Sequence, residues 1–200
     1  MKKIPSLFIR EFNEDNTKNS INQVTPGCEW VLDGEGVATE KYDGTCCLIE
    51  QGKLYRRYDA KRGKVPPKDA IPCQPEPDPI TGHWPHWVPV KENNPDDKWY
   101  IEAFKKVEEQ SLLYGKYIID GTYELCGPHF LGNPYNLDFD IFYKHGDKVL
   151  EDVPRTFEGI KDYLKNHYIE GIVFHRGNGE MCKIKRTDFG FEWKNKRSKN

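Results

Sequence analysis

The longest strictly apolar stretch of this chain is four residues long, Cys46-Cys47-Leu48-Ile49. A membrane-spanning helix needs about 20 consecutive apolar residues, so no such helix is predicted. Short apolar stretches separated by polar and turn residues are typical of strands and amphipathic helices that pack around a core in water. Near the N-terminus, Leu7-Phe8-Ile9 is followed at once by charged residues, which does not fit a secretory signal. We therefore expect an intracellular, cytoplasmic protein.

Turn residues and apolar periodicity predict a mixture of strands and helices. Strands are expected over residues 29–32, 37–41, 46–50, 53–58, 117–125, 137–143, 171–175 and 181–186. One helix is expected to open at Asp96 and Asp97, and a second to cover 157–168, where apolar residues recur on one face. Strands and helices in this order indicate an α+β fold.

A length of 200 residues favours a single domain over two. The segment 65–97 contains nine of the fourteen prolines together with Trp84 and Trp87. Disordered linkers are poor in aromatic residues, so we expect an ordered excursion from the domain. The two tryptophans are expected to be packing anchors, with RNA stacking as the alternative.

Six cysteines, at positions 28, 46, 47, 73, 126 and 182, show neither a C-x-x-C pair nor regular spacing. Such a distribution predicts buried free thiols in a reducing compartment. Cys73, His83 and His86 would be an incomplete zinc set, because no fourth ligand follows them.

The net charge of −2 conceals two basic segments. Residues 53–68 carry a local charge of +6, residues 183–199 carry +5, and the remainder carries −13. Basic segments of this kind are most often solvated surface, but two of them together can also form a phosphate-binding surface. The small net charge therefore does not exclude a nucleic acid as partner.

Charged residues stand at or beside several predicted strands, in a fixed order along the chain. They occur in Lys41-Tyr42-Asp43-Gly44, Thr122-Tyr123-Glu124, Glu170-Gly171-Ile172-Val173 and Lys183-Ile184-Lys185. This order resembles motifs I, III, IV and V of the covalent nucleotidyltransferase superfamily of ATP-dependent polynucleotide ligases and capping enzymes. Further stretches resemble the small vertebrate-type 5′–3′ RNA ligases in particular: Asp43-Gly44-Thr45-Cys46-Cys47, Trp87-Val88-Pro89-Val90 and Gly132-Asn133-Pro134-Tyr135. The resemblance covers residues 28–193 and implies a nucleotidyltransferase (ATP-grasp-like ligase) fold, with antiparallel sheets flanked by helices around a nucleotide cleft.

The resemblance implies that Lys41 is the nucleophile that attacks the α-phosphorus of ATP and forms lysyl-AMP. A lysine with the ordinary pKa of about 10.4 is protonated at neutral pH. Lys183, Lys185 and a divalent metal would disfavour that ammonium form and neutralise the phosphates. Because residues two apart in a strand share a face, Lys183 and Lys185 are expected to point the same way, as is Asp43 with Lys41. Gly44 is expected to permit a tight turn.

Nucleotide and metal contacts follow from the same resemblance. Glu124 would contact the ribose and the metal, and Glu170 would contact the metal, which is expected to be Mg²⁺ or Mn²⁺. The backbone around Thr39 and Glu40 would border the adenine. Phe139, predicted to share a strand face with Ile141 and Tyr143, would stack on the base.

Basic residues would bind RNA. Arg57 would contact the nucleotide ribose or the RNA 5′-phosphate, where a guanidinium can make two parallel hydrogen bonds. The other candidates in the first basic segment are Arg56, Lys61, Arg62 and Lys64. We expect a minimal adenylation domain over residues 1–200, without a separate C-terminal nucleic-acid-binding domain and without an obligate protein partner. The expected partner is RNA with 5′-phosphate and 3′-hydroxyl ends.

Two other functions remain open from the sequence. A DNA ligase or an RNA-capping guanylyltransferase would use the same lysine chemistry, although the position two after Gly44, often arginine in those enzymes, is Cys46. A non-catalytic RNA-binding module would retain the basic segments without forming an adenylate.

Overall fold

The structure is a computed structural model that describes residues 1–12, 18–114 and 119–193. The chain divides into two compact units, which are described separately. Unit 1 comprises Met1–Lys3 and Gly44–His145, and unit 2 comprises Ile4–Asp43 and Gly146–Asn200. This division does not test the expectation of one adenylation domain, which stays a prediction.

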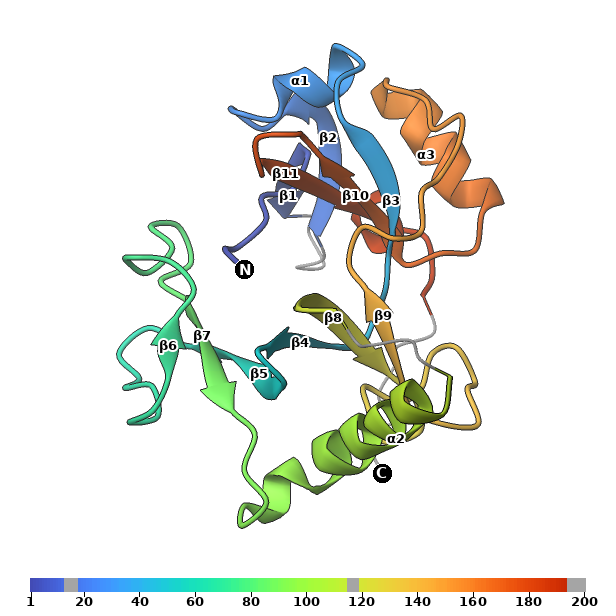
Figure 1. Ribbon diagram of the computed structural model, residues 1–200. Coiled ribbons are helices and arrows are strands. Elements are labelled where there is room, and N and C mark those ends of the chain that lie inside the picture. The colour runs from blue at the N-terminus through green and yellow to red at the C-terminus, as the bar shows by residue number, and fades with distance from the viewer. Residues whose placement is uncertain (13–17, 115–118, 194–200) are drawn as a thin grey trace. The chain divides into compact units, whose positions relative to one another are not determined.

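Unit 1 is built on a six-stranded antiparallel sheet with strand order β6-β7-β5-β4-β8-β9 (Figure 1). Its strands are β4 (Thr45–Glu50), β5 (Lys53–Ala60), β6 (Ile71–Pro72), β7 (Trp84–Pro89), β8 (Gly121–Cys126) and β9 (Ile141–Lys144). Gln51 and Gly52 join β4 to β5 with φ values of 51° and 70°, as a two-residue hairpin turn requires. This turn sets the register of the two central strands.

One long helix covers part of this sheet. The short helix η1 (Pro95–Asp97) leads into α2 (Lys98–Tyr114). Ala103, Tyr100 and Phe104 of α2 pack with Leu125 and other apolar residues of the sheet to form the core of unit 1. The helix predicted from Asp96 is therefore confirmed, and its apolar side faces the sheet.

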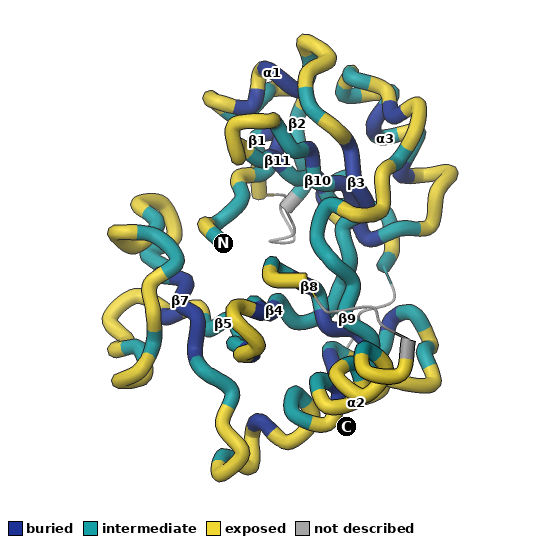
Figure 2. The backbone as a smooth tube through the Cα atoms, viewed as in Figure 1, coloured by how far each residue is buried: buried dark blue, intermediate teal, exposed yellow. Residues whose placement is uncertain are grey.

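The proline-rich segment 65–97 is ordered and contributes β6 and β7. Residues 85–88 of β7 are all buried, and Figure 2 shows this stretch in dark blue. Trp87 is 6% exposed, and the indole N–H of Trp84 donates a hydrogen bond to the Gln74 carbonyl at 2.8 Å. The packing-anchor interpretation therefore fits Trp87, because an almost fully buried ring offers no face to a base.

Unit 2 holds a three-stranded antiparallel sheet of order β11-β10-β3 and a separate two-stranded sheet, β1-β2. Its elements are β1 (Phe8–Phe12), β2 (Lys18–Val24), α1 (Glu29–Leu32), β3 (Val37–Lys41), α3 (Phe157–Asn166), β10 (Gly171–His175), β11 (Met181–Lys185) and η2 (Arg186–Phe189). Thr156 caps α3 by accepting the Gly159 N–H, and Ile160 and Leu164 enter a core with Ile172. The sheets are thus antiparallel with few helices, as the α+β prediction requires.

Several local predictions were wrong. Residues 29–32 form the four-residue helix α1 and not a strand, because an apolar stretch this short does not distinguish the two structures. The strand predicted over 137–143 begins only at Ile141. Strands β1 and β2 were not predicted at all. Of the strand predicted over 117–125, residues 117 and 118 lie outside the described residues, and β8 begins at Gly121.

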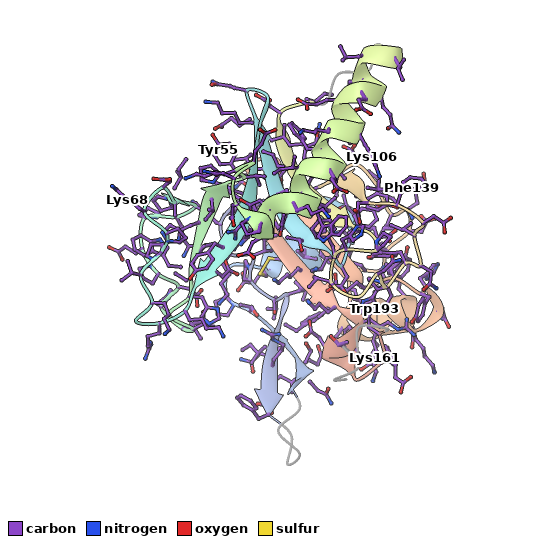
Figure 3. The ribbon with its side chains drawn as sticks, turned by 90° about the horizontal axis from the view of Figure 1, so that it is seen from below. Tyr55, Lys68, Lys106, Phe139, Lys161 and Trp193 are labelled. Atoms are coloured by element: carbon purple, nitrogen blue, oxygen red, sulfur yellow. A yellow bond between two sulfur atoms is a disulfide. The ribbon has the colours of Figure 1, made fainter. Side chains whose placement is uncertain are left out.

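The prediction that all six cysteines are free thiols was also wrong. Cys28 and Cys182 form a disulfide in unit 2, with their Cα atoms 6.1 Å apart across a sequence separation of 154 (yellow bond in Figure 3). Cys46, Cys47, Cys73 and Cys126 are free. Spacing along the chain could not reveal this bond, because the fold brings its two partners together from opposite ends of the unit's sequence.

Among the described residues, no helix has both the length and the apolar character that crossing a membrane would require.

Candidate functional site

Lys41 lies at the end of β3, directly opposite Gly171 of β10. Its Nζ is 2.5 Å from Oε2 of Glu170, the residue that immediately precedes β10. Glu170 is only 3% exposed, so the ion pair is largely shielded from solvent. The proposed nucleophile is therefore held in place by a buried carboxylate.

A second lysine occupies the other oxygen of the same carboxylate. Lys185 lies opposite Gly171 on the other side of β10, and its Nζ is 2.7 Å from Glu170 Oε1. Strands β3, β10 and β11 thus bring two ammonium groups onto one buried acid. Both oxygens of Glu170 are engaged by cations within unit 2.

Gly171 allows this close alignment of the strands. A Cβ atom at this position would overlap the Ile184 carbonyl oxygen and would lie 3.0 Å from Lys185 Cα. Any side chain at residue 171 would push β11, and with it Lys185, away from β10. The glycine of the Glu170-Gly171 pair is therefore a packing requirement.

Lys183 completes a cationic cluster with Lys41 and Lys185. Burial, followed by the charges of Lys41 and Lys185, lowers the pKa of Lys183 to about 8. The predicted common face of Lys183 and Lys185 fits the register, since they pair with Val173 and Gly171, two residues apart on β10. Lys41, Lys183 and Lys185 thus bring three ammonium groups together near Glu170.

Thr39 and Glu40 precede Lys41 in β3 and are 2% and 8% exposed. The Thr39 hydroxyl donates to the Val173 carbonyl at 3.2 Å. The Glu40 N–H donates to the Lys148 carbonyl at 2.9 Å, and its Oε2 lies 2.6 Å from Lys148 Nζ. The structure thus fixes this backbone firmly, while its predicted contact with adenine stays a prediction.

Asp43 lies beyond the end of β3, which ends at Lys41. Its Oδ2 accepts a hydrogen bond from the indole N–H of Trp193 at 2.8 Å. Residues two apart share a face only within a strand, and Asp43 lies outside β3. Strand alternation therefore gives no reason to expect Asp43 on the same face as Lys41. Trp193, labelled in Figure 3, was not predicted to contact a site residue.

In unit 1, Glu124 lies on β8 opposite Cys46 of β4. Its Oε1 accepts the Gly44 N–H at 3.1 Å, and its Oε2 is 2.9 Å from Nε2 of His145. A carboxylate oxygen only accepts hydrogen bonds, so the imidazole must donate from Nε2. Burial, followed by the charge of Glu124, raises the pKa of the Cys46 thiol to about 12, which keeps it protonated.

Gly44 is required for a different reason from the one predicted. Its φ is not in the left-handed region, so no special turn conformation demands glycine. A Cβ atom would instead overlap the Leu125 carbonyl oxygen and would lie 2.6 Å from Cys126 Sγ. The backbone at Gly44 approaches β8 this closely because it donates to Glu124.

The arginines of β5 already have partners within unit 1. Arg57 donates from Nε to Asp59 at 2.9 Å and from a terminal nitrogen to the Met1 carbonyl at 2.7 Å. Arg56 donates from Nε to Asp97 at 2.8 Å, and Asp97 is 1% exposed. Arg56 therefore makes a buried structural ion pair, and its role in RNA binding stays a prediction.

The remaining predicted RNA-binding residues, Lys61, Arg62 and Lys64, are exposed in the loop after β5. Their exposure leaves them accessible to a phosphate backbone. Phe139 is 57% exposed in the segment before β9 and is labelled in Figure 3. It is thus outside the predicted strand, and its stacking on adenine stays a prediction.

The carboxylates can be tested for their fit to Mg²⁺ or Mn²⁺. These hard cations take oxygen ligands and are commonly bound through one or two carboxylates, water and substrate phosphates. Glu170 is a suitable oxygen donor, but Lys41 and Lys185 engage both of its oxygens. Glu124 is also engaged at both oxygens. Glu170 and Glu124 each fit as a carboxylate ligand of such a cation when the metal displaces one of the groups that now contact the carboxylate oxygens.

Two residues of the site surroundings were missed by sequence reasoning. His145 was given no role from the sequence, yet it contacts Glu124. Trp193 follows the last predicted strand and contacts Asp43. A lone histidine or tryptophan without a motif gives no signal of such a contact, because the contact depends on residues far away in the chain.

Comparison with known proteins identifies the family. A family model described as RNA ligase 1 matches residues 68–199, about two thirds of the chain. This stretch includes Glu124, Glu170 and Lys183, and it begins after Lys41. The chain is also 25% identical over 270 residues to RNA ligase 1 of Pongo abelii and 26% identical over 269 residues to RNA ligase 1 of Rattus norvegicus. Both alignments cover 96% of this chain and 82% of the relative. This chain belongs to the RNA ligase 1 family.

Proposed function

We propose that this chain is an ATP-dependent RNA ligase that joins RNA 5′-phosphate and 3′-hydroxyl ends through lysyl-AMP on Lys41. The observation that carries the proposal is the cluster in which Glu170 holds Lys41 and Lys185 on its two oxygens, with Lys183 beside them. Membership of the RNA ligase 1 family supports ligation of RNA as the reaction.

The charge of this cluster favours a polyphosphate ligand. Lys41, Lys183 and Lys185 bring three ammonium groups close to Glu170, and the lowered pKa of Lys183 reflects the cost of holding its proton beside the other two. An anion with several charges would offset that cost and make charge-assisted hydrogen bonds to the ammonium groups. The triphosphate of ATP is such an anion.

The reaction would consist of three phosphoryl transfers. In the first, Lys41 Nζ loses a proton and attacks the α-phosphorus of ATP, so that a P–N bond forms and diphosphate leaves. In the second, an oxygen of the RNA 5′-phosphate attacks that phosphorus and Lys41 leaves. In the third, an RNA 3′-hydroxyl loses its proton, attacks the 5′-phosphorus and releases AMP. Positioning and charge stabilisation supply most of the rate in reactions of this class.

Lys41 must be deprotonated to attack. The ammonium groups of Lys183 and Lys185 disfavour the charged form of Lys41, whereas Glu170 favours it. A ligand that draws Glu170 away from Lys41 would therefore promote the nucleophilic form. We propose that Glu170 changes partner in this way when the substrate and a divalent cation are bound.

A bound Mg²⁺ or Mn²⁺ would supply positive charge to the phosphates. We propose Glu170, within unit 2, and Glu124, within unit 1, each by itself as a carboxylate ligand for such an ion. For the nucleotide we propose Thr39, Glu40, Asp43, Gly44, Arg57, Glu124 and Phe139. For the RNA we propose the exposed residues Lys61, Arg62 and Lys64, with Arg56 and Arg57 as further candidates.

Radiolabelling tests the proposal directly. After incubation with α-labelled ATP and Mg²⁺ or Mn²⁺, denaturing electrophoresis should show a labelled band at 23.4 kDa. Lys41→Ala and Lys41→Arg should both abolish the label, because the arginine keeps the charge but does not lose a proton to become a nucleophile. Lys165→Ala, which removes a lysine from the exposed end of α3, is the matched control. A label that survives Lys41→Arg would refute Lys41 as the nucleophile.

Substrate choice separates the proposed ligase from the other functions. Labelled GTP in place of ATP tests for a capping guanylyltransferase, and nicked DNA in place of 5′-phosphorylated RNA tests for a DNA ligase. We expect label from ATP and joining of RNA. RNA binding without any adenylate, measured by intact mass in the presence of Mn²⁺, would instead indicate a non-catalytic RNA-binding module.

A further inference from the structure

Three neighbouring strands of unit 1 bring a thiol, a carboxylate and an imidazole to one face of the sheet. Cys46 of β4 lies opposite Glu124 of β8, and Glu124 lies opposite Tyr143 of β9. His145 follows β9 by one residue, and its N–H donates to the Thr122 carbonyl at 3.1 Å, which continues the pairing. Alternation along β9 therefore places His145 on the same face as Tyr143 and Glu124.

The side chains converge as this register requires. One ligand atom each of Cys46, Glu124 and His145 lies within 4.8 Å of the other two. In the described part of the chain, no other three histidine, cysteine or acidic side chains come this close. The side chains of His145 and Glu124 are 20% and 12% exposed, so the group is shielded but accessible to a small ion.

His145 also has a nitrogen that the fold leaves unsatisfied. Its Nε2 donates to Glu124, while its buried Nδ1 has no hydrogen-bond partner among the described residues. In a neutral ring with the proton on Nε2, Nδ1 carries a lone pair. No partner on Nδ1 within the described ranges fixes this tautomer, so the ring proton can move from Nε2 to Nδ1 and free the Nε2 lone pair, beside Glu124, to ligate a metal.

We propose that Cys46, Glu124 and His145 form a binding site for a borderline divalent cation, with Zn²⁺ as its ion. Sulfur and imidazole nitrogen are ligands that Zn²⁺ prefers, whereas Mg²⁺ and Mn²⁺ prefer oxygen. Three protein ligands leave the fourth tetrahedral position to water. This site shares Glu124 with the metal and nucleotide contacts proposed above, but binding of Zn²⁺ by Cys46 and His145 needs neither ATP nor the chemistry on Lys41.

The geometry needs only side-chain adjustment to bind the ion. Zinc bonds of about 2.0–2.3 Å place tetrahedral ligand atoms about 3.5 Å apart, so movements of about 1 Å close the group around the metal. The Cys46 thiol must release its proton to solvent as the S–Zn bond forms, because only the thiolate ligates zinc. Glu124 can keep the Gly44 N–H on Oε1 while Oε2 turns from His145 to the metal.

Cobalt(II) titration of the purified full chain, without reductant and without nucleotide, tests this site. Co²⁺ replaces Zn²⁺ in such sites and gives a thiolate-to-cobalt charge-transfer band when a cysteine ligates it. We expect the band to saturate at one equivalent and to disappear on addition of Zn²⁺, whose filled d shell gives no such spectrum.

Matched variants decide the outcome. Cys46→Ser should remove the band, and Glu124→Gln should weaken Co²⁺ binding at least about tenfold. Cys73→Ser, which removes another partly buried free cysteine of unit 1, should leave both unchanged. Far-UV circular dichroism checks that each variant is folded, and Glu124→Gln keeps the test decisive if Cys46→Ser does not fold. A band that persists in Cys46→Ser, a band lost in Cys73→Ser, affinity unaffected by Glu124→Gln or no saturable binding would each overturn the proposal.

Discussion

Lys41 and Gly171 lie directly opposite each other on β3 and β10, and Lys185 of β11 lies opposite Gly171 on its other side. The glycine lets the three backbones approach so closely that both lysines reach Glu170. This alignment is a property of backbone packing, because a Cβ atom at residue 171 would overlap the Ile184 carbonyl oxygen. A substitution at Gly171 therefore tests both the stability of the chain and the geometry of the lysine cluster.

Gly171→Ala should lower the free energy of unfolding by about 1–3 kcal/mol, because the new methyl group forces β11 away from β10. Adenylation of Lys41 should fall as well, since Lys185 moves with β11. Gly177→Ala is the control, because a Cβ there would meet no atom within 4 Å. Denaturant unfolding measures both variants, and equal stabilities for the two would contradict the packing argument.

Loss of the Cys28–Cys182 disulfide should destabilise the chain. The bond closes a separation of 154 residues, and removal of a native disulfide typically costs about 2–5 kcal/mol. Cys28→Ser with Cys182→Ser should therefore unfold at a lower temperature than the parent under non-reducing conditions. Cys73→Ser should not. In reductant the difference between parent and double variant should shrink, and a difference that stays constant would mean that the bond is not formed in the parent.

Lys183 should make stability depend on pH. Its folded pKa of about 8 is below its unfolded value of 10.5, so between these pH values the unfolded chain holds more protons. The free energy of unfolding therefore rises with pH through this window, and below about pH 8 the folded state bears the cost of a buried ammonium. Lys183→Met should remove this rise. Urea unfolding of parent and variant at pH 7, 8.5 and 10 measures this rise. If the difference in free energy of unfolding between parent and variant did not change with pH, the prediction would be wrong.

Thiol reactivity should differ sharply between Cys46 and Cys73, although both are partly buried and free. Burial and Glu124 raise the pKa of Cys46 to about 12, so almost no reactive thiolate exists at pH 8. Iodoacetamide at pH 8 should thus modify Cys73 first in the native protein, as peptide mass mapping would show. In Cys73→Ser, native alkylation should nearly stop, and rapid modification of Cys46 there would show that its thiol is not protonated.

Substitutions at Arg56 and at Lys64 should have different effects, the first on stability and the second on RNA binding. Arg56→Ala leaves Asp97 buried without its ion pair, which should cost about 3 kcal/mol of stability. Lys64→Ala removes an exposed charge and should change stability by less than about 0.5 kcal/mol. If the exposed loop binds RNA, Lys64→Ala should weaken binding and reduce its dependence on salt. Unfolding and RNA titration at two salt concentrations test both, and a stable Arg56→Ala would contradict the structural role of this pair.

The sequence by itself determined those parts that depend on local chemistry. Gln51-Gly52 predicted the turn between β4 and β5 because Gly and its neighbour must accept positive φ. The periodicity over 157–168 predicted α3, and spacing by two predicted that Lys183 and Lys185 share a face of β11. The order of the charged motifs predicted the family. The turn, the helix and the shared strand face each depend on a short stretch of sequence, and the motif order is found along the chain itself, so no knowledge of the fold was needed.

The tertiary structure alone decided which side chains meet. Register places Lys41 and Lys185 on either side of Gly171, and so on one carboxylate, and it joins Glu124 to His145. Burial made Arg56 the ion-pair partner of Asp97, and packing paired Cys28 with Cys182. Such contacts join residues separated by 15 positions, for Glu170 and Lys185, to 154 positions, for Cys28 and Cys182. They depend on strand pairing and core packing, which the sequence encodes only collectively and which no local pattern reveals.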